Sequence, residues 1–146
     1  MRILLVEDNK GDVRLLREAF RETSDNTEIE VAEDGELALA FLKHQGPYAH
    51  GSPRPHLILL DLNLPKVDGK QVLAAVKNDP ELRTIPVVVL SSSRSREDVL
   101  GSYNSHANCY IRKPSSFDGF ISVARGIQDF WLKLACLPDS GTASNG

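Results

Sequence analysis

Residues 56–65 have the sequence HLILLDLNLP, and the rest of the chain is organised around them. Four apolar residues precede Asp61, and turn-forming prolines lie on both sides of the run, at Pro55 and Pro65. A short apolar run between turn signals is typical of a strand that is buried on both faces of a sheet. We therefore expect Asp61 at the carboxyl end of a central strand, where ligands gather in open α/β sheets.

The composition indicates one globular domain. The chain has 146 residues, of which 41% are hydrophobic, and this is enough for one core. Its longest apolar runs are far too short to cross a bilayer and no signal peptide is evident, so we expect a cytoplasmic protein without a membrane segment. Two cysteines, Cys109 and Cys136, do not make a disulfide framework. The net charge of −3 offers no basic surface, so no nucleic-acid partner is expected.

Five strands alternate with five helices along the chain. This alternation predicts an α/β fold with a parallel sheet covered on both faces. With right-handed crossovers, the architecture that fits best is a single (βα)5, flavodoxin-like, doubly wound sheet with strand order 2-1-3-4-5. We expect the domain to span residues 1–136 and a flexible tail to occupy residues 137–146. Strands are predicted at residues 2–6, 28–32, 57–60, 85–90 and 109–111.

Polar residues mark the expected helix starts. Apolar positions between Phe117 and Leu134 form one stripe, which predicts one long last helix. The Gly- and Pro-rich residues 45–55 predict a long loop. Candidate caps are Asn9 or Asp12 for the first helix, Asp34 for the second, Ser95 for the fourth and Ser115 or Ser116 for the last.

In the predicted strand order, the carboxylates of Glu7, Asp8 and Asp61 meet, because the first and third strands are neighbours. Crowded carboxylates repel one another, so a cation is expected among them. Oxygen ligands with room for water suit Mg²⁺, and the backbone carbonyl of Asn63 can supply one more oxygen. The sequence therefore predicts a Mg²⁺ site formed by Glu7, Asp8, Asp61 and Asn63.

Two more polar groups are expected at the same edge of the sheet. The fourth strand ends in the hydroxyl of Ser91, and the fifth is followed by the ammonium of Lys113. Acids, a metal, a hydroxyl and a cation together suit phosphoryl transfer onto a carboxylate. In this interpretation Asp61 is the nucleophile, while Ser91 and Lys113 take up the charge on the oxygens of the transferred group.

Each of these features also has a simpler explanation when it is taken alone. A stretch such as Glu7-Asp8-Asn9 can be a turn with a helix cap, and Asp61 can be a loop acid. Ser91 and Lys113 can be ordinary loop and turn residues, and Tyr110 can be a half-buried aromatic of a strand. Their joint occurrence at the ends of the first, third, fourth and fifth strands favours the functional interpretation.

The chain resembles the receiver domain of two-component response regulators, which has the CheY-like fold. The resemblance extends from residue 2 to about residue 134. It implies a phospho-accepting signalling protein, which catalyses only its own aspartyl phosphorylation and dephosphorylation, rather than an enzyme. The motifs that carry it are Glu7-Asp8, Asp61 followed by Leu-Asn-Leu-Pro, Asp68-Gly69, Ser91 and Lys113-Pro114.

The resemblance implies a role for the residues around the acidic cluster. Asp61 is implied to be the phospho-acceptor, which takes its phosphoryl group from a phosphohistidine of a sensor histidine kinase. The direct Mg²⁺ ligands are implied to be Asp8, Asp61 and the carbonyl of Asn63. Glu7 is implied to act mostly through water.

The resemblance also implies a switch. After phosphorylation the hydroxyl of Ser91 and the ammonium of Lys113 would move towards the phosphate, and Tyr110 would rotate into the space that Ser91 vacates. This shift in population would change the face formed by the fourth helix, fifth strand and fifth helix, where a partner binds. The bond between Lys113 and Pro114 is expected to be cis.

A narrower resemblance is to the small regulators that partner bacterial or cyanobacterial phytochromes. It implies a phytochrome-like light sensor as the upstream kinase, and a homodimer formed through the fourth helix, fifth strand and fifth helix. The stretches that carry it are the loop 45–55, residues 61–69 (DLNLPKVDG), 85–90 (IPVVVL), 108–111 (NCYI) and 130–138.

Alternative classes of protein fit fewer of the residues. A haloacid-dehalogenase-type phosphatase would need a second acid where Asn63 stands, and a cap domain. A flavodoxin-like binding module would need a phosphate loop rich in Gly, Ser or Thr in place of residues 7–9. A degenerate receiver that acts as a constitutive adaptor would normally have lost Asp61 or Lys113, and both are present. No output domain is expected, so the output would be a protein contact.

Overall fold

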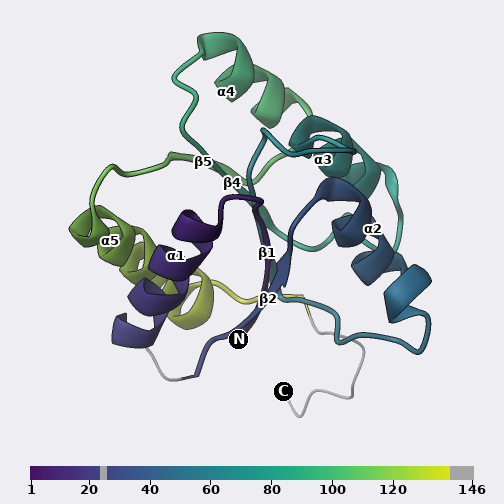
Figure 1. The fold of residues 1–146 in the computed structure, drawn as a ribbon, viewed down its shortest axis with the longest axis horizontal. Coiled ribbons are helices and arrows are strands. Elements are labelled where there is room, and N and C mark those ends of the chain that lie inside the picture. The colour runs from purple at the N-terminus through teal and green to yellow at the C-terminus, as the bar shows by residue number, and fades with distance from the viewer. Residues whose placement is uncertain (24–25, 139–146) are drawn as a thin grey trace.

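The computed structural model describes residues 1–23 and 26–138, which form alternating strands and helices (Figure 1). The strands are β1 (Arg2–Val6), β2 (Glu28–Ala32), β3 (Leu57–Leu60), β4 (Val87–Ser91) and β5 (Cys109–Arg112). The helices are α1 (Lys10–Thr23), α2 (Gly35–Lys43), α3 (Gly69–Asn78), α4 (Arg96–Asn104) and α5 (Phe117–Ile127).

The five strands form one parallel sheet in the order β2-β1-β3-β4-β5. Strand β3 lies between β1 and β4, and its Leu60 is paired with Val6 on one side and Val89 on the other. Every residue of β3 and β4 is buried, which explains why both strands are apolar apart from Ser91 at the end of β4. The predicted flavodoxin-like fold is confirmed.

Helices cover both faces of the sheet. Helices α1 and α5 pack side by side on one face, and α2 and α3 lie on the other (Figure 1). Side chains of β1 alternate between the two cores: Ile3 and Leu5 pack with α1 and α5, while Leu4 and Val6 pack with α2 and α3. This alternation follows from the two-residue period of a strand.

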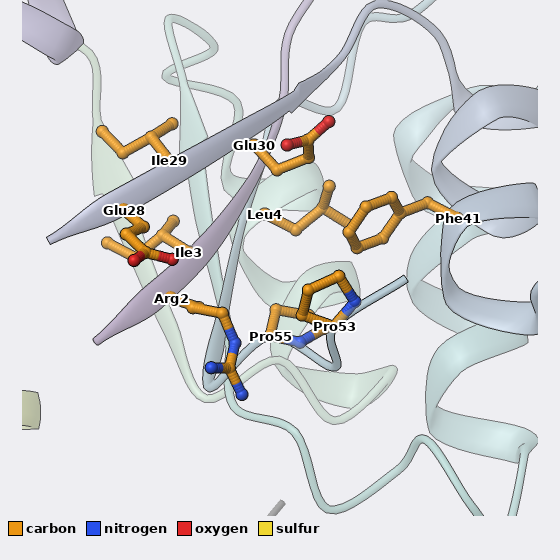
Figure 2. Close-up of a pocket in the computed structure, with 9 residues that line it drawn as sticks. All are labelled: Arg2, Ile3, Leu4, Glu28, Ile29, Glu30, Phe41, Pro53 and Pro55. Carbon is orange, nitrogen blue, oxygen red and sulfur yellow. The ribbon is translucent and has the colours of Figure 1, made fainter. Parts of the chain in front are cut away.

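The loop 45–55 connects α2 to β3, and its last two prolines lie near the amino ends of β1 and β2, opposite Asp61. It contains a short 3₁₀ helix, η1 (Gly46–Tyr48), whose tyrosine ring packs edge-on against Phe41 of α2, with ring centroids 5.0 Å apart. Pro53 and Pro55 lie beside Phe41 at the start of β1, around a cavity of about 90 Å³ (Figure 2). Ligand pockets are usually larger than roughly 300 Å³, so we assign this cavity to packing.

Two elements differ in extent from the prediction. Strand β4 begins at Val87 and not at residue 85, because Pro86 has no amide hydrogen to donate to a ladder. The last helix is regular only as far as Ile127 and continues as the π-helical segment η2 (Gln128–Leu134). An apolar stripe does not distinguish the hydrogen-bond pattern of an α-helix from that of a π-helix, so the sequence predicted one continuous helix.

The helix starts that the sequence left open are now defined. Asn9 caps α1, because its side chain accepts a hydrogen bond from the N–H of Asp12 at 3.0 Å. Ser116 caps α5 by accepting one from the N–H of Gly119. Asp34 and Ser95 cap α2 and α4, as predicted.

The far end of the predicted tail, residues 139–146, lies outside the described residues. The domain boundary at residue 136 therefore stays a prediction. In the part of the chain that is described, no helix combines the length and the hydrophobicity that a bilayer crossing requires.

Gly69, at the start of α3, lies against the backbone that follows β3. Its N–H donates to the carbonyl of Leu62 at 2.9 Å. A Cβ atom at this position would lie 2.1 Å from the carbonyl oxygen of Asp61, so only glycine permits the approach. The first turn of α3 thereby fixes the loop that carries Asp61.

Replacing Gly69 by alanine is expected to lower the free energy of unfolding by about 1–3 kcal/mol, because the added methyl group pushes the Asp61 loop away from α3. The matched control is Gly101→Ala on α4, where a Cβ would meet nothing within 4 Å. In that control the free energy of unfolding is expected to rise by about 0.4–1 kcal/mol. Urea unfolding of both variants measures the difference, and equal midpoints for Gly69→Ala and the wild type would contradict the packing.

Candidate functional site

Asp61 follows β3 directly and lies at the carboxyl edge of the sheet. Its N–H donates to the carbonyl of Val6 at 3.0 Å, which continues the pairing with β1. Its carboxylate Oδ1 accepts a hydrogen bond from the N–H of Asn63 at 3.2 Å. Asp61 is 6% exposed, so it is held by its surroundings but still reaches the surface.

Glu7 and Asp8 follow β1 and lie beside Asp61. The N–H of Glu7 donates to the carbonyl of Ala32, and its Oε2 accepts from the N–H of Asn9 at 3.2 Å. Glu7 is only 1% exposed, whereas Asp8 is exposed. The structure thus brings one buried and one open carboxylate to Asp61, as the strand order predicted.

The three carboxylates fit a divalent cation. One oxygen from each of Glu7, Asp8 and Asp61 lies within 4.8 Å of the others. Carboxylate oxygens that are partly open to water are the ligands that Mg²⁺ prefers. Asn63 lines a surface pocket of about 460 Å³ together with Asp8, so the two residues share one opening.

Burial raises the pKa of the Glu7 carboxyl to about 7. The hydrogen bond to Lys113 opposes this effect, and the neighbouring carboxylate of Asp61 adds to it. The physical cause is the cost of holding a second negative charge next to Asp61 away from water.

Lys113 supplies the positive charge that the cluster needs. Its Nζ lies 2.6 Å from Glu7 Oε1, 2.9 Å from Asp12 Oδ2 and 3.2 Å from Asp61 Oδ2. Its side chain is only 11% exposed. Burial by itself would lower the pKa of Lys113, but the hydrogen bonds to Asp12 and Glu7 and the attraction of the carboxylates outweigh it and raise the pKa.

Asp12 is a residue of this site that the sequence did not predict. It was considered only as a helix cap, but Asn9 fills that role and leaves the Asp12 carboxylate free to reach Lys113. The available signal was its spacing. Asp12 follows Asp8 by four residues and lies in the first turn of a helix that starts at the edge where Asp61 lies.

Ser91 and Tyr110 are linked through the loop between β4 and α4. The buried Ser91 hydroxyl accepts a hydrogen bond from the N–H of Ser93 at 3.2 Å. The hydroxyl of Tyr110 donates to the carbonyl of Ser93 at 2.9 Å. Ser93 also donates from its own hydroxyl to Asp98 of α4 at 2.6 Å. A movement of Ser91 would therefore alter the hydrogen bonds that Ser93 forms with Tyr110 and with Asp98 of α4.

The bond between Lys113 and Pro114 is trans, since the described residues contain no cis peptide bond. The expectation of a cis bond was therefore wrong. The trans form of a bond before proline is lower in energy by about 0.5–1 kcal/mol. With this form, the N–H of Lys113 donates to the carbonyl of Ser91 at 2.9 Å.

The chain is similar in sequence and fold to known response regulators. Residues 3–125 match the model of the response regulator receiver domain. The chain is 48% identical over 136 residues to the response regulator Rcp1 of Synechocystis, covering 93% of this chain and 92% of that protein. It is 49% identical to the phosphorylated cyanobacterial phytochrome response regulator RcpA, with a TM-score of 0.89 and coverage of 94% and 98%. The Mn²⁺-bound form of Rcp1 is 47% identical, with a TM-score of 0.87 and coverage of 94% and 99%.

Adding Mg²⁺ is expected to stabilise the fold, by roughly 2.7 kcal/mol when its concentration is a hundred times its Kd, because binding screens the crowded carboxylates. The variant Asp8→Asn should lose most of this gain. Glu22→Gln, which alters an exposed acid at the other end of α1, should keep it. Thermal unfolding with Mg²⁺ or with a chelator measures the effect, and an equal gain in Asp8→Asn would contradict the assignment.

Proposed function

The chain belongs to the family of response regulator receiver domains, and we propose that it accepts a phosphoryl group on Asp61 from a phosphohistidine of a sensor histidine kinase. One observation carries this proposal. The carboxylate of Asp61 belongs to an acidic cluster that fits a divalent cation, and it also contacts the ammonium of Lys113 at the edge of the sheet.

In the proposed reaction, a carboxylate oxygen of Asp61 attacks the phosphorus of the phosphohistidine. An O–P bond forms while the N–P bond breaks, and the imidazole leaves with the electron pair of the broken bond and takes a proton from water. The product is an aspartyl phosphate. Because Asp61 sits at the end of a buried strand, its oxygens are positioned before the donor arrives.

We propose Mg²⁺ as the cation of the acidic cluster. Asp8, Asp61 and the carbonyl of Asn63 would bind it directly, and Glu7 would bind through water. When bound, it would neutralise negative charge on the oxygens of the transferred group. Support comes from the carboxylate oxygens of Glu7, Asp8 and Asp61, which lie within 4.8 Å of one another, and from the Mn²⁺-bound structure of the similar Rcp1.

Ser91 and Lys113 are the proposed partners of the phosphoryl oxygens. The Nζ of Lys113 is 3.2 Å from Asp61, so it is within reach of a group attached to that carboxylate. Ser91, buried at the end of β4, can donate its hydroxyl proton after a change of rotamer. These are roles of positioning and charge stabilisation, so the domain would catalyse only its own phosphorylation and dephosphorylation.

The proposed donor is a phytochrome-like histidine kinase. The support is the similarity to RcpA, which is described as a cyanobacterial phytochrome response regulator and shares 49% of its residues with this chain. The phosphoryl group would then arrive in response to light.

We propose that phosphorylation changes the surface formed by α4, β5 and α5. Reorientation of Ser91 towards the phosphate would break its hydrogen bond from Ser93, the residue that also accepts from Tyr110 and donates to Asp98. The loop before α4 and the ring of Tyr110 would then adopt a second arrangement, which the phosphate favours.

This surface, together with the segment η2 that continues α5, is the proposed site of self-association. Within the described residues, the large hydrophobic side chains that are exposed all lie on α4 or in η2, and Leu134 is 78% exposed. Beside η2, a groove of about 540 Å³ between β5 and α5 is lined by Ile111, Val123 and Trp131, among others. Exposed apolar surface of this extent is typical of a protein interface, and we propose a second copy of the chain as its occupant.

Phosphotransfer tests the acceptor. Radiolabelled acetyl phosphate, or a phosphorylated phytochrome-like kinase, should label the wild-type protein in the presence of Mg²⁺, and Asp61→Asn should remain unlabelled because an amide cannot form the acyl phosphate. Asp118→Asn, a change at an exposed acid of α5, should be labelled like the wild type. Label on Asp61→Asn would place the acceptor elsewhere.

Sedimentation analysis tests self-association. We expect wild-type dimers, and Leu134→Lys should shift them towards monomers because a charge is placed in the apolar surface. Ala49→Lys adds the same charge to an exposed position beside η1 and should sediment like the wild type. Identical sedimentation of Leu134→Lys and the wild type would rule out this interface.

A further inference from the structure

The carboxylate of Asp12 hydrogen-bonds to Lys113 at 2.9 Å, although the two residues are 101 positions apart in the sequence. Lys113 Nζ has three protons, and they face three carboxylates, those of Glu7, Asp12 and Asp61. Of these three, Asp12 alone is absent from the group whose oxygens lie close enough to share a cation.

We propose that Asp12 is a positioning residue, which holds the ammonium of Lys113 beside Asp61 while the phosphoryl group is transferred. This inference rests on the proposed function. In that reaction Asp61 carries the phosphoryl group, and Glu7 faces the cation. Asp12 has neither task, so its bond to Lys113 can persist from the start of the reaction to its end.

The local structure suits Asp12 to this task. Its backbone is fixed in the first turn of α1, because its N–H donates to the capping side chain of Asn9 at 3.0 Å. Its side chain is 23% exposed, and its Oδ2 points at the Nζ of Lys113. The lysine side chain is long and flexible, so without a fixed partner its ammonium would occupy several positions.

If Asp12 acted mainly by repelling the phosphoryl donor, its removal would change the phosphorylation rate in the opposite direction. A carboxylate near the acceptor repels an anionic phosphoryl donor. If repulsion were its main effect, removing it would accelerate phosphorylation. If it positions Lys113, removing it slows phosphorylation, because the ammonium is no longer held where charge develops.

The test is the rate of labelling by acetyl phosphate in Mg²⁺ for the wild type, Asp12→Ala and Asp12→Asn. We expect Asp12→Ala to be slower by roughly ten- to a hundredfold. Asp12→Asn keeps an oxygen that accepts the Lys113 hydrogen bond and should regain most of the rate. Asp118→Ala removes an exposed acid from the first turn of α5 and should be labelled like the wild type. Equal or faster labelling of Asp12→Ala would overturn the proposal.

A double-mutant cycle separates positioning from a general structural role. In Lys113→Ala, the further change Asp12→Ala should have no effect on the labelling rate, because Asp12 acts through the lysine. If Asp12→Ala slowed labelling in Lys113→Ala as much as it does in the wild-type background, the proposal would be overturned. It would also be overturned if Asp12→Ala lost as much Mg²⁺-induced stabilisation as Asp8→Asn does. Failure of the wild type itself to accept label would instead overturn the proposed function.

Discussion

The ammonium of Lys113 forms hydrogen bonds with carboxylates from three separate segments, which are the end of β1, the first turn of α1 and the end of β3. Without a cation, these carboxylates, of which Glu7 and Asp61 are buried, would repel one another at the edge of the sheet to which the backbone brings them. Breaking a buried ion pair by removing one partner usually costs about 3–5 kcal/mol. The stability of the carboxylate cluster at this edge therefore depends on this lysine.

The same electrostatic arrangement suits the site to phosphoryl transfer. Asp61 follows a buried strand, shares a cluster of acids that fits a cation, and contacts an ammonium that can pair with a new anionic group. From Ser91, hydrogen bonds lead through Ser93 to Tyr110 and to Asp98 of α4. Helix α4 also carries the exposed side chains of Leu100 and Tyr103, so the hydrogen bonds connect the site with an exposed apolar surface.

The sequence predicted the residues that follow strands, because the strand order alone decides which strand ends meet. Asp61, Glu7 and Lys113 were placed at one edge in this way. Asp12 was not, since the direction of a side chain in the first turn depends on where the helix begins, and Asn9 and Asp12 were equally acceptable caps. The cis and trans isomers of the bond before Pro114 differ too little in energy for the sequence to decide between them. The π-helical turns of η2 share their apolar stripe with a regular helix, so they too could not be predicted.

In the proposed reaction the phosphoryl group is carried by the carboxylate of Asp61, which contacts Lys113 within the acidic cluster. Borohydride reduction of the phosphorylated protein converts an aspartyl phosphate into homoserine, and peptide mass spectrometry then identifies its position. We expect homoserine at position 61 and unchanged aspartate at Asp8 and Asp12. Homoserine at either of those two positions, or phosphate on a histidine or serine with residue 61 intact, would contradict it.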